Sequence, residues 1–256
     1  MTMSMGMSMA KRTITLTATD KSITRMADAE LFDLMSWMSP AWPIGAFAHS
    51  SGLEWAVEAG HVTDRSSTRD WIVALVEHGA IHNDLVLFTH AWRASRLGDA
   101  GRFDEVAQLA LASQIGHERY VESTAQGSAF VRISRAASGV ADFTKQLAGL
   151  ERTDIAYPVA AAALFALRGI ALERALTAWL HGAVSNLVSA AQRLVPLGQT
   201  DGQLVLHDCR EVVMAAAKHM ANLPDGDPFD ALGGCTLVAD LGCMAHETQY
   251  TRLFRT

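Results

Sequence analysis

Apolar residues recur at helical spacing along almost the whole chain after residue 28. Leu31, Leu34, Met35 and Met38 follow the i, i+3, i+4, i+7 pattern that lines one helix face, and Pro40 ends the run. This pattern predicts a helix over about residues 29–39. Similar patterns predict further helices over about 52–59, 67–79, 84–98, 158–169, 172–195, 201–222 and 230–248. Residues 102–137 form either one helix or two, because two glycines interrupt them.

Capping signals support several of these boundaries. Ser51 with Glu54, and Ser67 with Asp70, have the spacing of a capping box at a helix start. Gly60 follows the second helix at the place of a left-handed C-terminal residue. Pro158 and Gly169 bracket another helix in the usual order, proline first and glycine last.

Strand patterns are scarce. Only "TITLT", residues 13–17, alternates like a strand, and it follows the methionine-rich start "MTMSMGMSM". That start lacks the basic residues and the long apolar core of a signal peptide. We therefore predict an all-α, single-domain bundle of about nine or ten helices over residues 26–256. Residues 1–25 are predicted to be disordered or artificially added.

Composition narrows the possible partners and the location. The chain of 256 residues is 50% hydrophobic and has a formal net charge of -6, which argues against binding nucleic acid. Its longest apolar run, residues 155–167, is too short for a membrane span. Three cysteines without a C-x-x-C pair indicate a reducing, cytoplasmic location, and the P-loop pattern is missing.

Two groups of residues raise the question of a metal. His78 and His82 form H-x-x-x-H, with Asp84 or His90 as a third ligand, but Gly79 stands where zincins carry a glutamate base. We interpret them as polar residues at a helix junction, and keep a helical metal-dependent hydrolase as the alternative. The second group comprises Cys235, Cys243 and His246. We interpret it as small buried cysteines beside a histidine rather than as metal ligands.

Two loops and the C-terminus carry the remaining candidates. The loop "WPIGAFAHSSGLEWA", residues 42–56, lacks the G-x-S-x-G elbow, so we predict a structural turn in which His49 forms hydrogen bonds. In "PLGQTDGQ", residues 196–203, we favour a helix cap by Thr200 or Asp201 over an anion site. The end, "HETQYTRLFRT", has the aromatic and apolar residues of a segment that docks on a partner or on its own domain.

Four stretches in chain order resemble the urease accessory protein F (UreF) family. They are "LMSWMSPAWPIGAFAHSSGLEWAVEAG", "YPVAAAALFALRGI", "NLVSAAQRLVPLGQTDGQ" and "HETQYTRLFRT". The resemblance spans about residues 31–256. It implies an all-α protein that is not an enzyme and has no cofactor, that forms a homodimer, and that binds the accessory protein UreD (UreH). The resulting complex recruits the GTPase UreG, so that nickel and carbon dioxide enter the urease apoprotein. UreF-like proteins either activate the GTPase or couple its hydrolysis to nickel transfer.

The resemblance also implies roles for individual residues. Its GTPase-facing patch corresponds to Arg193, Gln199 and Gln203, the first of which is often lysine in relatives. Its UreD-facing part is the C-terminal segment, ordered against an aromatic residue of the first loop, here Phe47 where some relatives have tyrosine. The UreD-facing residues of that segment are Gln249, Tyr250, Arg252, Leu253, Phe254 and Arg255. We expect deletion of residues 251–256 to weaken UreD binding with little loss of stability.

Overall fold

The computed structural model describes residues 18–147 and 154–256, with side chains from residue 28 onward. Its described residues form helices and connecting loops without a strand, which confirms the all-α prediction. Ten of the helices are seven residues or longer. The methionine-rich start and the "TITLT" segment lie outside the described residues. In order, the elements are α1 (Ala18–Trp37), η1 (Ala46–Ala48), α2 (Leu53–Glu58), α3 (Arg65–His78), α4 (Ala80–Leu97), α5 (Ala100–Ala112), α6 (His117–Ala137), α7 (Ala141–Gln146), α8 (Tyr157–Arg168), α9 (Leu172–Leu194), α10 (Gln199–Asp208), α11 (Arg210–Ala221), α12 (Pro228–Ala231) and α13 (Leu237–His246).

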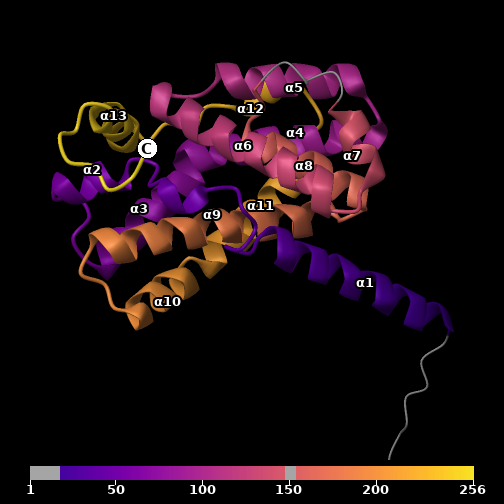
Figure 1. Cartoon of the computed structure of the whole chain (residues 1–256), viewed down its shortest axis with the longest axis horizontal. Coiled ribbons are helices and arrows are strands. Elements are labelled where there is room, and N and C mark those ends of the chain that lie inside the picture. The colour runs from indigo at the N-terminus through magenta and orange to yellow at the C-terminus, as the bar shows by residue number, and fades with distance from the viewer. Residues whose placement is uncertain (1–17, 148–153) are drawn as a thin grey trace, which may run out of the picture.

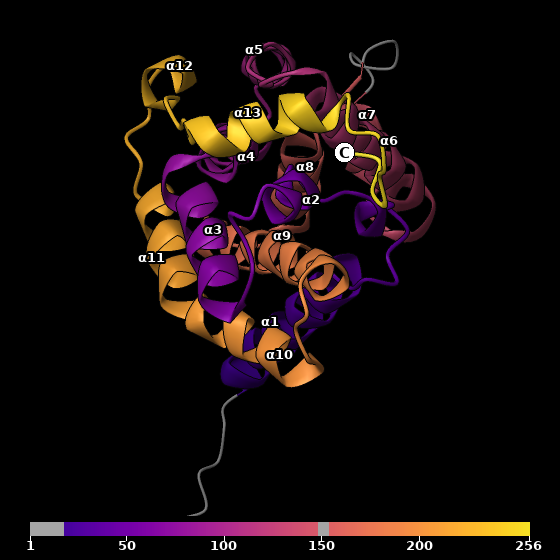
Figure 2. The same cartoon turned by 90° about the vertical axis from the view of Figure 1, so that its left-hand side faces the viewer.

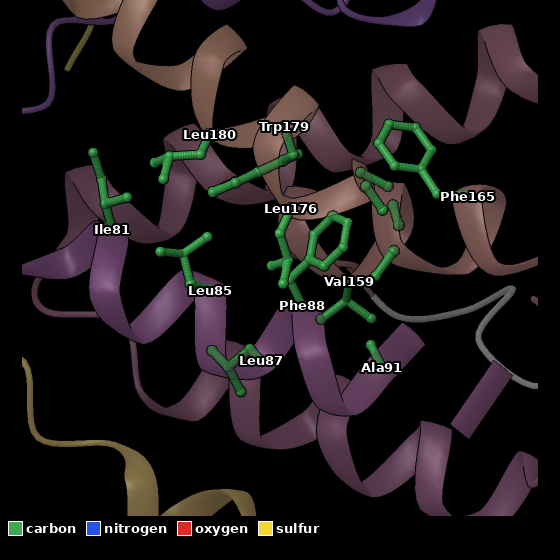
Figure 3. Packing of buried hydrophobic residues seen from close by; sticks show 14 of the residues in the cluster. Ile81, Leu85, Leu87, Phe88, Ala91, Val159, Phe165, Leu176, Trp179 and Leu180 are labelled. Atoms are coloured by element: carbon green, nitrogen blue, oxygen red, sulfur yellow. The ribbon is translucent and has the colours of Figure 1, made fainter. Parts of the chain in front are cut away.

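Helix α8 forms the centre of the core. Every residue from Pro158 to Ala166 is buried, and the small alanines allow α4, α6 and α9 to pack closely around it. Figure 3 shows the aromatic part of this core, where Phe88 of α4 lies between Phe165 of α8 and Trp179 of α9. As predicted, α8 begins with Pro158 in its first turn and is followed by Gly169 in the left-handed conformation.

A glycine allows α6 to approach the chain just before α8. A Cβ atom on Gly127 would lie 2.0 Å from the carbonyl oxygen of Ile155, so no larger residue fits there. Gly116, with φ of 85°, ends the break between α5 and α6. The predicted stretch 102–137 is therefore two helices, which confirms the two-helix alternative.

Several predicted boundaries were wrong. Helix α1 begins at Ala18 rather than near residue 29, so residues 18–25 of the segment predicted to be disordered are helical. Helix α3 begins at Arg65, because Asp64 accepts the amide hydrogen of Ser67 at 2.8 Å, and the Ser67–Asp70 cap is not formed. The predicted helix over 201–222 is divided at Cys209 into α10 and α11.

The predicted helix over residues 230–248 is also interrupted. Residues 232–236 leave the helix between α12 and α13, because Asn83 of α4 binds their backbone. Its side-chain oxygen accepts the amide hydrogens of Gly233 and Gly234, and its side-chain amide donates to the Gly234 carbonyl at 3.0 Å. Tertiary hydrogen bonds thus replace those that a continuous helix would have made.

Helix α1 projects from one end of the bundle, whereas α13, α2 and the C-terminus lie together at the other end (Figure 1). In the view of Figure 2, α13 crosses above α2, and the C-terminus lies beside the end of α13. Within the described residues, no helix combines the length and the apolar character that crossing a bilayer requires.

Candidate partner-binding site

The C-terminal segment, residues 247–256, folds back onto the loop before α2. The amide of Arg255 donates to the Ala48 carbonyl at 2.8 Å, and the amide of Ser50 donates to the Thr256 main-chain oxygen at 2.7 Å. His49 Nδ1 lies 2.7 Å from the Thr256 hydroxyl, and burial lowers the pKa of this histidine. His49 therefore has the hydrogen-bonding role predicted for it, and the loop is a structural turn.

Glu54 of α2 holds the same segment from beneath. Its carboxylate accepts the amide hydrogens of Leu253 at 2.6 Å and of Phe254 at 2.9 Å, and it is almost fully buried. The predicted capping box of Ser51 with Glu54 is wrong. The N-cap of α2 is Gly52, no side chain caps the helix, and the Ser51 hydroxyl instead donates to Glu122 of α6 at 2.9 Å.

A fully buried histidine joins α13 to α2 and α6. His246 Nε2 lies 3.1 Å from Glu54 and Nδ1 lies 2.8 Å from Glu118, and the residue has no exposed surface. Arg252 of the C-terminal segment also donates to Glu118, at 3.2 Å. Each ring nitrogen of His246 thus faces a buried carboxylate that also accepts hydrogen bonds from the C-terminal segment. These contacts connect three helices and the C-terminal segment.

The last aromatic residue anchors the segment in a small second core. Phe254 is only 3% exposed and packs among apolar residues of α2, α9 and the loops beside them. These are Leu53, Ala56, Val62, Ala190, Ala191 and Val195. Deleting residues 251–256 would remove this ring and the two backbone amides that donate to Glu54. The expectation that such a deletion leaves stability nearly unchanged is therefore revised, and we expect a loss of stability.

Arg193, in the last turn of α9, lies between two aromatic rings. Its guanidinium carbon is 3.7 Å from the ring centre of Phe47 and 4.1 Å from that of Phe254. Its Nη1 donates to the Phe47 carbonyl at 2.8 Å, and its Nε donates to the Ser189 carbonyl at 3.2 Å. Phe47 thus contacts the C-terminal segment through Arg193, which the sequence alone did not indicate.

More buried charge lies below the loop. Arg119 of α6 pairs with Glu122 at 2.8 Å and with Asp84 of α4 at 3.2 Å. Burial raises the pKa of Asp84 to about 6, although Arg119 acts in the opposite direction. These charges border a cavity of about 540 Å³ between residues 37–47, α6 and α9, whose aromatic walls include Trp42 and Trp179. No pattern in the sequence indicated this cavity.

The outer surface of this region is apolar. Four residues of α13 follow helical spacing and are about half exposed or more, and two residues of the C-terminal segment are exposed beyond them. We call these six residues the C-terminal face: Leu237, Val238, Leu241, Met244, Tyr250 and Leu253. The face continues the predicted docking segment, of which the sequence had identified only Tyr250 and Leu253.

The remaining predicted residues of the segment have separate roles. The Gln249 side chain binds Glu58 of α2 and the Thr251 carbonyl. Arg255 is exposed and is held by its backbone amide. The segment therefore docks on its own domain, one of the two alternatives left open by the sequence, and also presents side chains outward; docking on a partner stays a prediction.

The predicted GTPase-facing residues are not alike in the structure. Gln199 and Gln203 are exposed and one turn apart on α10, and Gln199 accepts a hydrogen bond from Gln192 at 3.3 Å. The guanidinium of Arg193 instead turns toward Phe47 and Phe254. Asp201 accepts the Gly198 amide hydrogen at 3.3 Å, which agrees with the helix cap preferred for this turn.

The two groups considered as metal ligands have other environments. His78 ends α3 and His82 lies in α4 after the break at Gly79, so the two rings do not share one helix face as the hydrolase alternative required. Burial raises the pKa of the Cys243 thiol to about 12, and Cys235 is exposed. Across the described ranges, no three His, Cys, Asp or Glu side chains are arranged to hold a metal ion.

The amino-acid sequence is similar to those of known urease accessory proteins. The sequence profile of the UreF family matches residues 62–210. A protein of Rhodopseudomonas palustris (strain BisB5) named urease accessory protein UreF is 48% identical over 231 residues, which cover 89% of this chain and 92% of the relative. A protein of the same name from Bradyrhizobium sp. (strain ORS 278) is 45% identical over 228 residues, covering 89% and 92%. The chain therefore belongs to the UreF family of urease accessory proteins.

Proposed function

We propose that this protein is a non-enzymatic scaffold for urease maturation in the cytoplasm. It binds UreD (UreH) through the C-terminal face, recruits and regulates the GTPase UreG near Gln199 and Gln203, and acts on the urease apoprotein within that complex as a homodimer. Nickel for the urease active site is the cargo of the complex. The observation that carries the proposal is the apolar C-terminal face, held in place by hydrogen bonds to the buried carboxylates of Glu54 and Glu118.

The character of this face supports a protein partner. Monomeric proteins seldom leave a row of large apolar side chains on one helix without a use, because burying them would stabilise the fold or a complex. The C-terminal face adds Tyr250, which is fully exposed, and Leu253, which is 64% exposed. Because Glu54 and His246 hold the backbone beneath them, ordering these side chains costs little entropy when a partner binds.

A charge substitution on α13 tests the UreD site. We expect Leu241→Arg to weaken binding to purified UreD by about thirtyfold or more, as for a residue at the centre of an interface. Met214→Arg is the matched control, because Met214 is a similarly exposed apolar residue on α11. Binding is measured by titration calorimetry. Equal affinities of the two variants, or no binding of UreD by the unaltered protein, would refute the proposal.

A second experiment tests the GTPase site. With UreD bound, the double variant Gln199→Ala/Gln203→Ala is expected to lose most of its capture of UreG, because both side chains are exposed on the first turns of α10. Its affinity for UreD should stay within about twofold of the unaltered protein. Normal capture of UreG by the double variant would remove α10 from the proposed interface.

A further inference from the structure

Every nitrogen of the Arg193 guanidinium is engaged or enclosed. Nε and Nη1 donate to the carbonyls of Ser189 and Phe47, and Nη2 is buried without a partner within the protein. The rings of Phe47 and Phe254 contact the guanidinium within 4.1 Å. An arginine that reaches into a partner's active site needs a free guanidinium, and Arg193 in this state does not provide one.

We infer that Arg193 is a positioning residue, which orders the C-terminal segment against the loop of residues 44–48 and does not contact the GTPase itself. The inference rests in part on the proposed function, because it reassigns a residue of the proposed GTPase-facing patch. Its structural part concerns this chain alone. Arg193 joins three separate pieces of chain, namely α9, the loop that carries Phe47, and the segment that carries Phe254.

The chemistry of this position favours arginine over lysine. A guanidinium is planar, so it can stack on aromatic rings and still donate two hydrogen bonds in its plane. A lysine ammonium keeps the charge but has no flat face for the rings. Burial lowers the pKa of Arg193 without removing its charge, and the two rings and two carbonyls compensate for the lost hydration.

The location of Arg193 explains how it can affect both proposed partner sites. Helix α9 ends one residue after Arg193, and the turn that follows leads to Gln199 at the start of α10. On the other side, Phe254 fixes the segment that carries the C-terminal face. A partner that binds the ordered segment therefore stabilises the Arg193 contacts, and by linkage those contacts favour binding of that partner.

Hydrogen exchange of the purified protein without partners tests the inference. The reporters are the amides of Ser50 and Arg255, which donate across the junction between the loop and the segment, and the amide of Phe254, which donates to Glu54 of α2. Arg193→Met keeps an unbranched apolar stem and removes the charge and the donors, and Arg193→Lys keeps the charge but loses the planar guanidinium. We expect both variants to exchange these amides about tenfold faster or more. Gln199→Ala is the control and should leave the exchange unchanged.

A third variant is a control for misfolding of the two Arg193 variants. Phe47 is 65% exposed, so Phe47→Leu removes one ring from Arg193 without disturbing the core, and it should also speed exchange at the same amides. Unchanged exchange in all three variants would overturn the inference, as would loss of UreG capture with unchanged exchange. Faster exchange supports it whether or not UreD and UreG bind, so failure of the proposed function would be recognised separately.

Discussion

Replacing Glu54 by glutamine tests how the C-terminal segment is held, because one buried carboxylate there accepts the amide hydrogens of Leu253 and Phe254. The same carboxylate also contacts the ring of His246. Glutamine has nearly the same shape, so the change removes charge and one acceptor without opening a cavity. The amide group of glutamine would face the N–H of either Leu253 or Phe254, donor against donor.

The size of the effect follows from these contacts. A hydrogen bond to a charged group contributes about 1.5–3 kcal/mol, and the variant loses at least one of them. The buried donor left without a partner adds a cost, while His246 keeps its bond to Glu118 at 2.8 Å. We therefore expect Glu54→Gln to weaken docking of the segment by about 3 kcal/mol. This corresponds to about a hundredfold faster exchange of the two amides.

The assay is hydrogen exchange of Leu253 and Phe254, together with urea unfolding. Glu58→Gln is the matched control, because Glu58 lies one turn further along α2, is exposed, and contacts Gln249 of the same segment. The control should change stability by less than about 0.5 kcal/mol. If both variants behave alike, or if Glu54→Gln leaves the exchange unchanged, then the buried carboxylate does not hold the segment.

Three further predictions concern stability. Gly127→Ala should destabilise the fold by about 3 kcal/mol in urea unfolding, because its Cβ would overlap the Ile155 carbonyl, whereas Gly182→Ala meets only ordinary contacts and should be neutral or stabilising. Phe254→Ala should cost about 3 kcal/mol if the second core contributes to global stability, and an unchanged midpoint would contradict this. Burial raises the pKa of Asp84 to about 6, so this carboxyl stabilises the fold less as pH rises through 6. The free energy of unfolding of Asp84→Asn relative to that of the unaltered protein should therefore rise by about 2 kcal/mol between pH 4 and pH 7, and a constant difference would refute it.

Local patterns in the sequence predicted most of the helices because the forces that start and end them are local. Pro158 and Gly169 bracket α8 as expected, and Gly60 follows α2 with φ of 77°. Each depends on backbone geometry within one turn of chain. The break between α5 and α6 was likewise predictable from Gly116, as one of two alternatives.

The errors come from interactions across long stretches of sequence. Glu54 had the spacing of a capping residue, yet its oxygens bind amides about 200 residues further along. Asn83 captures the backbone of Gly233 and Gly234 and so ends a pattern that otherwise indicates one helix. A charged side chain in an amphipathic segment normally indicates a solvated face, and nothing local marked Glu118 as buried.

The ionic character of this junction has a structural reason. The C-terminal segment carries adjacent apolar side chains, Leu253 outward and Phe254 inward, and a purely apolar hollow would accept either of them. Glu54 and Glu118 together remove this ambiguity, because Glu54 binds the amides of Leu253 and Phe254 while Glu118 accepts a hydrogen bond from the side chain of Arg252. A one-residue slip would separate Arg252 from Glu118 and leave this buried carboxylate without its arginine. The buried charges of α2 and α6 therefore determine which side chains of the C-terminal segment face outward, and so determine the surface that a partner meets.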